Sequence, residues 1–379
     1  MSAKPNAEPI PFIDLQTQRI RVADRVNAAI AKVMAHGAFI LGPEVTELER
    51  RLASYVGVQH VITCASGTDA ILLALLAYGI RPGDAVFIPA FGFVAAAEMT
   101  ALLGATPVFV DVDPKNFNLD PASLATAIAE QRHGPLRPAA ILAIDLYGQA
   151  ADYAQLTELA TREGLPLIED AAQSFGGTFQ GKKCGALAPI ATTSFYPAKP
   201  LGCYGDGGAV FTDDATLAET MRRMRVHGEG DEKYRFQHVG INGRMDTLQA
   251  AVLLEKLAIF DEELAARQRT AARYEAALRD CVETPQLMPE ARSAWAQYTI
   301  QTEDRHVFAE KLREAGIPTA IHYPVSLTDL APYEKFPVVK GGVPTSEALA
   351  KKVISLPMHP YLKEDTQDQI INAVRKAVA

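Results

Sequence analysis

Between residues 61 and 170 the sequence alternates short apolar runs, which predict strands, with longer segments of helical periodicity. Strands and helices at this spacing are typical of crossover units, which build a mostly parallel sheet. Ligands of such sheets bind beyond the carboxyl ends of the strands. The predicted strands are Val61–Cys64, Ala85–Pro89, Pro107–Val112, Ala139–Ile144 and Pro166–Ile168, and the predicted helices are Ala70–Ala77, Val94–Leu103, Pro121–Glu130 and Asp152–Glu163.

The 379 residues are enough for about two domains. We predict a large domain over 1–259, including an N-terminal segment, and a smaller C-terminal α/β domain over 260–379. A long helical segment bridges them, and a loop without clear periodicity precedes it. The bridging helix is Thr247–Tyr274, the loop is Tyr234–Arg244, and the predicted elements of the small domain are Trp295–Gln301 and Pro318–Tyr323 as strands, Arg305–Ala315 as a helix, and a closing helix after Glu364.

One lysine, Lys199, stands in a turn crowded with aromatic residues, small residues and glycines, at 194–208. An isolated lysine is usually a solvated surface residue. The free amine of lysine has a pKa of ~10.4 and is a poor nucleophile at neutral pH. Burial or a neighbouring cation lowers that pKa and allows a Schiff base to form. A lysine that binds pyridoxal phosphate also needs an acid opposite the pyridine nitrogen and a cradle for the phosphate.

An acidic residue suited to that task, Asp170, ends the predicted strand at 166–168. A carboxylate there could hold a pyridine nitrogen protonated, so that the ring acts as an electron sink. A helix N-cap is an equally good interpretation of Asp170 alone. Gln173 follows closely and could bond a phenolate oxygen, or it could be a solvated helix residue.

A phosphate site is predicted where Val61–Cys64 runs through a small-residue turn, 65–69, into the next helix. The free N–H groups and the positive end of the helix dipole face an anion in this geometry. A plain N-cap is the alternative. Phe91–Phe93 lies at a strand end of the same kind.

Charge, cysteine usage and histidine spacing narrow the function classes. The net charge of −8 argues against nucleic acid or an anionic membrane as partner. The best apolar run, 70–80, is too short to span a bilayer. Residues 1–9 are polar, without the apolar core of a signal peptide, and the four cysteines form no CxxC pair, which favours a cytoplasmic protein. His322 and His359 have no companion ligands, so no metal site is expected.

Four spaced stretches together resemble the DegT/DnrJ/EryC1/StrS family of nucleotide-sugar aminotransferases: 65–70, 169–174, 194–208 and 242–245. The resemblance extends from Phe12 to Pro360. It implies an α/β protein of the PLP-dependent transferase fold type I (aspartate aminotransferase-like), whose large domain has a mostly parallel mixed sheet. It also implies a homodimer with shared active sites.

The family's site residues carry over to matching positions. The resemblance implies that Lys199 binds pyridoxal 5'-phosphate covalently and that pyridoxamine phosphate forms during the reaction. The remaining implied roles are Asp170 at the pyridine nitrogen, Gln173 by the cofactor hydroxyl, Gly67, Thr68 and Ser194 at the phosphate, Phe93 stacked on the ring, and Asn242 reaching the phosphate from the other subunit. Gly92 stands where many members have threonine, so that side-chain contact is absent. Relatives with histidine in place of the lysine are dehydratases, and Lys199 argues against that branch.

A closer resemblance, at 36–44, 199–204, 322–324 and 355–360, is to enzymes that aminate UDP-2-acetamido-2-deoxy-3-oxo-glucuronate for lipopolysaccharide O-antigen synthesis. The partners it implies are L-glutamate and a UDP-linked keto sugar. If the loop at 242–244 is extended, Arg244 lies on the same face as Asn242 and can bind a carboxylate, whose planar geometry the guanidinium matches. His322 and Tyr323 are expected to approach the same ligand.

Two rival functions stay open on the sequence. One is an aminotransferase that acts at C4 of a deoxy-keto nucleotide sugar. The other is a non-catalytic regulator that binds pyridoxal phosphate. A regulator should carry an added DNA-binding module, for which this acidic chain has no room.

Overall fold

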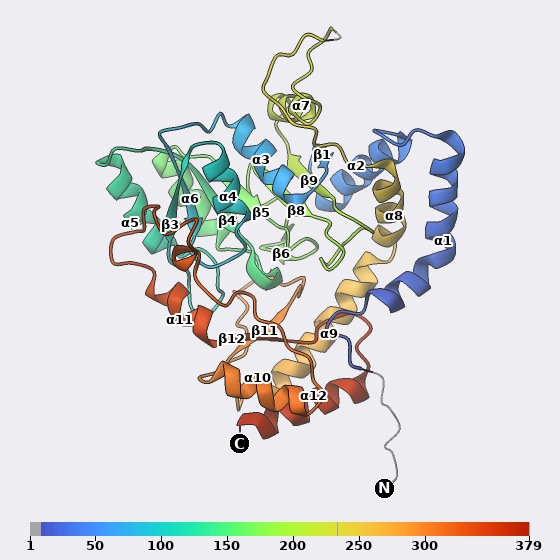
Figure 1. Cartoon of the computed structure of the whole chain (residues 1–379), viewed down its shortest axis with the longest axis vertical. Coiled ribbons are helices and arrows are strands. Elements are labelled where there is room, and N and C mark those ends of the chain that lie inside the picture. The colour runs from blue at the N-terminus through green and yellow to red at the C-terminus, as the bar shows by residue number, and fades with distance from the viewer. Residues whose placement is uncertain (1–8, 233, 379) are drawn as a thin grey trace.

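A seven-stranded mixed sheet forms the centre of the computed structural model, which describes residues 9–232 and 234–378 (Figure 1). The polar start of the chain, residues 1–8, lies outside the described residues. The strand order is β1-β9-β8-β5-β4-β2-β3. Only β9 runs antiparallel to its neighbours, and the other paired strands of this sheet are parallel. The bounds are β1 His60–Cys64, β2 Asp84–Pro89, β3 Thr106–Val110, β4 Arg137–Ile144, β5 Leu167–Asp170, β8 Ile190–Ser194 and β9 Gly208–Thr212.

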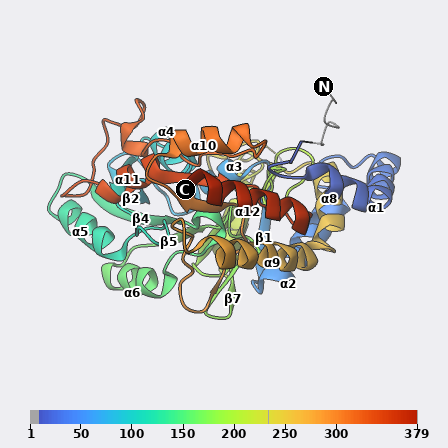
Figure 2. The ribbon, with the colours of Figure 1, turned by 90° about the horizontal axis from the view of Figure 1, so that it is seen from below.

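Helices cover both faces of this sheet, and therefore its strands are buried on both sides and appear as continuous apolar runs. Contacts join α3 to α4 and to α7 in one layer, and α5 to α6 in the other. Figure 2 shows α4 and α6 on opposite sides of the strands. The bounds are α3 Gly67–Ala77, α4 Ala95–Leu102, α5 Pro121–Arg132, α6 Tyr153–Glu163 and α7 Ala215–Met224. The predicted α/β architecture with a mostly parallel mixed sheet is confirmed.

The N-terminal segment forms two helices that pack on the helix after the 234–244 loop. These are α1 Leu15–His36 and α2 Pro43–Val56, against α8 Thr247–Leu257. Asp14 caps α1 by accepting a hydrogen bond from the Thr17 N–H. Val22 and Val26 of α1 pack with Val252 and Ile259 in a small apolar cluster.

The helix predicted over Thr247–Tyr274 is in fact two, α8 and α9 Phe260–Leu278, so that prediction was wrong. The chain leaves helical geometry at Ile259, with φ −113° and ψ 0°. Packing of Ile259 against α1 fixes this bend. The acidic residues Asp261, Glu262 and Glu263 then occupy the first turn of α9, where the helix dipole favours them.

The C-terminal residues build a separate hydrophobic core around a two-stranded antiparallel sheet, β11 with β12. This core is consistent with the predicted small domain; the boundary at 259/260 stays a prediction. Its elements are the second half of α9 with β11 Tyr298–Gln301, α10 Arg305–Glu314, β12 Val353–Leu356 and α12 Glu364–Val378. Helix α11 Pro344–Lys352 instead packs on the main core through Leu349 and Ala350. The shorter elements of the chain are β6 Thr178–Phe179, β7 Lys182–Lys183, β10 Ala291–Arg292, η1 Leu146–Gly148 and η2 Leu327–Asp329.

Two strand predictions in this part need correction. The 318–323 segment is not a strand, and only Ala320 forms a bridge, with Ser355. Pro318 and Pro324 bracket the segment and have no N–H to donate to a ladder. The strand predicted from Trp295 begins at Tyr298, because Trp295 has φ +51°, outside the extended region.

Candidate active site

The turn that carries Lys199 joins two neighbouring strands, β8 and β9, and is closed by backbone hydrogen bonds. The Phe195 N–H donates to the Gly207 carbonyl and the Cys203 N–H donates to the Phe195 carbonyl, at 2.7 and 2.8 Å. We call residues 195–207 the lysine turn. Burial lowers the pKa of the Lys199 amine, and the Asp170 carboxylate opposes that change. The lysine is therefore easier to deprotonate than a solvated one.

Asp170 lies at the carboxyl end of β5, and only 9% of its surface is exposed. Burial raises the pKa of its carboxyl group, while the Ala172 N–H and then Lys199 lower it. No helix begins here: Asp170 accepts a hydrogen bond from the Ala172 N–H, but residues 172–176 form a series of turns. The structure thus rules out the helix-cap interpretation and leaves the carboxylate facing the lysine.

The predicted phosphate turn has the geometry of an anion site. Ser66 caps α3 by accepting from the Asp69 N–H, and Gly67 and Thr68 are the first residues of that helix, whose N–H groups have no intrahelical acceptor. Ser194, at the end of β8, packs so closely that a Cβ on Gly67 would lie 2.6 Å from its Cβ. We call Ser66, Gly67, Thr68 and Ser194 the phosphate cradle.

Gln173 is buried, with 4% of its surface exposed, so it is not the solvated helix residue of the alternative interpretation. Its Oε1 accepts a hydrogen bond from the Tyr147 N–H at 2.8 Å. Burial raises the pKa of the Tyr323 phenol to about 12, and a hydrogen bond with Gln173 opposes that rise. Gln173 therefore connects the end of β5 to the segment around Tyr323.

His322 and Tyr323 come to the lysine from the C-terminal part of the chain. Burial lowers the pKa of His322, and the charge of Lys199 lowers it further. The Tyr323 ring lies 6.1 Å from the ring of Phe93, which is 52% exposed beyond the end of β2. The structure thus gathers Lys199, Asp170, Gln173, Phe93, His322 and Tyr323, the predicted residues, in one place.

The loop with Asn242 and Arg244 is tied to the phosphate cradle through the backbone. The Ala65 N–H donates to the Gly243 carbonyl at 2.9 Å. Asn242 is exposed, whereas the Nε of Arg244 is buried without a hydrogen-bond partner among the described residues. The position of Asn242 within its own chain indicates no role for its side chain. Its contact with the site of the other subunit stays a prediction.

Two residues of this region were not predicted, and both follow β4. The Tyr147 N–H contacts Gln173, and its phenol donates to the backbone carbonyl of His322. Asp145 accepts hydrogen bonds from the Ser174 hydroxyl and from the Tyr153 phenol. Their position after an apolar strand is the signal that could have found them.

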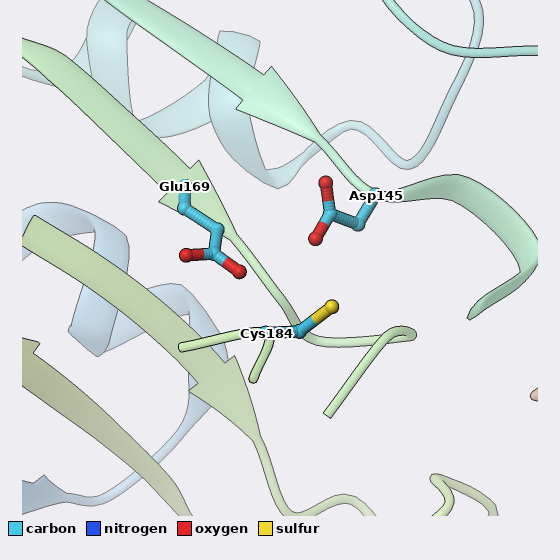
Figure 3. A group of neighbouring side chains, drawn as sticks. All are labelled: Asp145, Glu169 and Cys184. Atoms are coloured by element: carbon cyan, nitrogen blue, oxygen red, sulfur yellow. The ribbon is translucent and has the colours of Figure 1, made fainter. Parts of the chain in front are cut away.

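Behind the site, Asp145, Glu169 and Cys184 lie together, with one potential ligand atom of each within 4.8 Å of the others (Figure 3). Among the residues that the structure describes, this is the group that could hold a metal ion. Both carboxylates already accept protein donors, including the N–H groups of Ala151, Gly185 and Leu187. These bonds indicate a structural cluster. Burial raises the pKa of Asp145 to about 7, and that of Glu169 well above its ordinary value.

Residues 21–375 match the model of the DegT/DnrJ/EryC1/StrS aminotransferase family. The chain belongs to this family. It is 48% identical over 357 residues to the UDP-2-acetamido-2-deoxy-3-oxo-D-glucuronate aminotransferase of Pseudomonas aeruginosa, covering 93% of this chain and 96% of the relative. Its fold matches a crystal structure of a DegT/DnrJ/EryC1/StrS aminotransferase from Brucella abortus with a TM-score of 0.96 and 52% identity, over 98% of this chain and 100% of that one.

A solved structure that carries a cofactor is also similar: NtdA of Bacillus subtilis with bound PMP. It has a TM-score of 0.88 and 29% identity and covers all of this chain and 87% of that one. The aminotransferase described here is a PLP-dependent enzyme, as the sequence predicted. Its residues fit that cofactor, since a half-buried amine lies near a buried carboxylate and a cradle beside them is too tight for a Cβ at Gly67.

None of the helices in the described part of the chain has both the length and the apolar character needed to cross a membrane.

Proposed function

We propose that this aminotransferase moves the amino group of L-glutamate to C3 of UDP-2-acetamido-2-deoxy-3-oxo-D-glucuronate. The products are UDP-2-acetamido-3-amino-2,3-dideoxy-D-glucuronate and 2-oxoglutarate. The similarity to the Pseudomonas aeruginosa enzyme over nearly the whole chain supports this substrate. Fold similarity alone would not, because members of one fold act on many substrates.

Pyridoxal phosphate, when bound, supplies an electron sink and carries the nitrogen between the two half-reactions. Lys199 binds the cofactor and, once released, moves a proton between the substrate carbon and the cofactor carbon as general acid and base. Its lowered pKa suits this exchange. Asp170 would keep the pyridine nitrogen of the cofactor protonated, and Gln173 would lie by its ring hydroxyl.

Gly67, Thr68 and Ser194 of the cradle would hold the phosphate of the cofactor, with Asn242 of the partner subunit completing the site. Phe93 would stack on the cofactor ring. His322 and Tyr323 would contact the sugar, because both are half-buried, His322 lies near Lys199 and Tyr323 lies near Asp170.

The observation that carries the uronate assignment is Arg244. Its Nε is buried without a partner, on a loop fixed to the cradle through Gly243 and Ala65. A buried guanidinium nitrogen without an acceptor is costly, and a carboxylate would satisfy it with two parallel bonds. The substrate's uronate carboxylate, or that of glutamate, is the acceptor in this proposal.

Arg244→Gln tests the assignment. We expect a loss of about 2–5 kcal/mol in transition-state stabilisation with the 3-keto uronate, because the partner charge stays desolvated and unpaired. A matched 3-keto sugar without the carboxylate should lose little. Arg235→Gln, an exposed arginine of the same loop paired with Glu232, is the control.

Measuring the glutamate half-reaction alone separates the outcomes. A loss confined to that half-reaction places Arg244 at the donor, and no loss in either half-reaction rejects its role. Incubation with glutamate and a panel of keto nucleotide sugars, with mass spectrometry of the products, decides between C3 and C4 amination. No aminated sugar at all would favour the regulator.

We further propose that the enzyme works as a homodimer in the cytoplasm and serves lipopolysaccharide O-antigen synthesis. Three exposed apolar residues at the end of α1 and just after it support a subunit interface at this face: Met34, Phe39 and Ile40.

A further inference from the structure

A pocket lies where α1 and α8 meet the lysine turn. Its volume is about 270 Å³. None of the residues that line it is acidic: they are Leu15, Gln16, Gln18, Arg19, Pro197, Cys203, Tyr204 and Lys256. Two of them, Arg19 and Lys256, are basic, and neither has a role in the proposed reaction.

Lys256 is the unusual member of this pocket. Only 1% of the residue is exposed, yet no hydrogen bond or ion pair of its ammonium group occurs within the described residues. Its nearest aromatic contact is with the ring of Tyr204, whose centroid lies 5.1 Å from Nζ. Burial lowers the pKa of this amine to about 8, and the Glu263 carboxylate opposes the change. The ammonium group is thus almost enclosed by protein, and its contact within the described residues is the Tyr204 ring, which is a costly environment for a cation.

The neighbouring acid does not neutralise Lys256 by direct contact. Both carboxylate oxygens of Glu263 accept hydrogen bonds from Gln18, and one also accepts the phenol of Tyr361. Glu263 is itself only 2% exposed. The pocket side of Lys256 therefore lacks an acceptor.

A second basic residue, Arg19, lines the same pocket near Tyr204. Arg19 is exposed on α1, where its Nε donates to Gln16, and its charge lowers the pKa of the Tyr204 phenol against the effect of burial. Tyr204 is 39% exposed, so its hydroxyl can reach a ligand. Lys256, Arg19 and Tyr204 thus present three donors around one pocket from three elements.

We propose that this pocket binds a phosphate group, with Lys256 as the buried counter-charge and Arg19 and Tyr204 at its mouth. Donors from three directions suit the several oxygens of a phosphate better than the two of a carboxylate. Pro197, Cys203 and Tyr204 belong to the lysine turn, so the bound group would contact the segment that positions Lys199. The phosphate comes either from free inorganic phosphate or, if the proposed function holds, from the diphosphate of the nucleotide sugar.

The test is isothermal titration of the PLP-loaded enzyme, whose phosphate cradle is filled, with inorganic phosphate and separately with UDP. We expect one site per chain, weakened at least tenfold by Lys256→Met and several-fold by Arg19→Gln. Lys256→Arg should restore part of the affinity. Arg25→Gln, an exposed arginine on the same helix, is the control and should bind as the wild type does.

The two ligands separate the sources. If inorganic phosphate and UDP both bind, and Lys256→Met weakens both, the pocket is a site for free phosphate. If Lys256→Met weakens the binding of UDP alone, the pocket is a site for the nucleotide diphosphate. The proposal is overturned if neither ligand binds, or if Lys256→Met and Arg19→Gln both bind as the wild type does. Arg19 is exposed, so its variant keeps the test valid even if Lys256→Met fails to fold. Neither titration uses a keto sugar, so the result is independent of the substrate assignment.

Discussion

The phenol of Tyr147 donates a hydrogen bond to the backbone carbonyl of His322, across a sequence separation of 175 residues. The same residue donates its backbone N–H to Gln173. Tyr147 has φ +61°, a left-handed conformation that bulky residues rarely adopt and that is often found at functional sites. One strained residue thus joins the end of β4, the cofactor residues and the segment that carries the candidate substrate residues.

Tyr147→Phe should therefore impair the sugar half-reaction more than the glutamate half-reaction. It leaves the backbone carbonyl of the half-buried His322 without this donor, at a cost of about 1–3 kcal/mol, and frees the 322–323 segment. The measurement is KM and kcat of each half-reaction. Tyr274→Phe, which also removes a buried phenol bonded to a backbone carbonyl, at Pro357, is the matched control. Equal losses in both half-reactions would show that Tyr147 has only a structural role.

Replacing Lys199 with alanine should give an enzyme that still binds the cofactor but no longer holds it covalently. Treatment of the wild type with borohydride should fix the cofactor to the peptide that contains Lys199, as mass spectrometry of a digest can show. Lys183→Ala, a lysine whose ammonium lies over the Tyr55 ring, should leave this labelling unchanged. Label on any other peptide would refute the assignment.

Asp170→Asn should keep the fold and lose most of the activity, since the ring nitrogen is no longer held protonated. A hydrogen bond to a charged group contributes about 1.5–3 kcal/mol, which corresponds to about one to two powers of ten in rate. The absorption spectrum of the bound cofactor should shift as well. Wild-type kinetics in the variant would remove Asp170 from the mechanism.

The buried pair Asp145 and Glu169 should make stability depend on pH. Burial raises the pKa of Asp145 to about 7, and it also raises the pKa of Glu169 well above its ordinary value. In the unfolded chain both carboxyl groups ionise at about pH 4. Between that pH and neutrality the folded state therefore binds more protons than the unfolded state does. The free energy of unfolding should therefore fall as the pH rises through this window.

Urea unfolding at about pH 5 and about pH 8 measures this dependence. Glu169→Gln removes one titrating group and should flatten the profile, whereas Glu158→Gln, exposed on α6, should not. A profile in the Glu169 variant as steep as in the wild type would show that this pair is not its source.

Mixed dimers test whether the site is shared between subunits. Lys199→Ala and Asn242→Ala chains should each be inactive, but one site of a heterodimer combines the intact Lys199 of one chain with the intact Asn242 of the other. After subunit exchange, about a quarter of the sites should work if the contribution is symmetric. Lys199→Ala mixed with Asp170→Asn should recover nothing, because both residues lie on the same chain of each site. No recovery in the first mixture, with exchange confirmed, would place Asn242 outside the partner's site.

The sequence predicted the parallel strands and the residues at their carboxyl ends well, because a strand buried on both faces leaves an uninterrupted apolar run. Asp170 and the start of α3 follow from that pattern, whereas Ser194 came only from the family resemblance, because β8 was not among the predicted strands. Their catalytic and binding roles rest on the family resemblance and stay predictions until the variants are measured.

Two features depend on tertiary packing and could not be predicted from the sequence: the bend at Ile259 and the position of Tyr147. The bend at Ile259 depends on the valines of α1, which are far away along the chain. Helical periodicity continues through the bend and gives no sign of it. Tyr147 was missed for a related reason, since its partners His322 and Gln173 become neighbours only after β4, β5 and the C-terminal segment have assembled.

Gly208 pairs with Cys64 on one side and with Ser194 on the other, so β9 joins the two halves of the phosphate cradle. It follows the lysine turn, and a Cβ there would lie 2.2 Å from the Ser66 carbonyl oxygen. During synthesis, β1 and α3 emerge first and cannot complete the cradle until β9 has been made and has inserted between β1 and β8. The cofactor thus meets a finished binding site only late in folding, and its uptake would report that the central sheet has closed in the correct register.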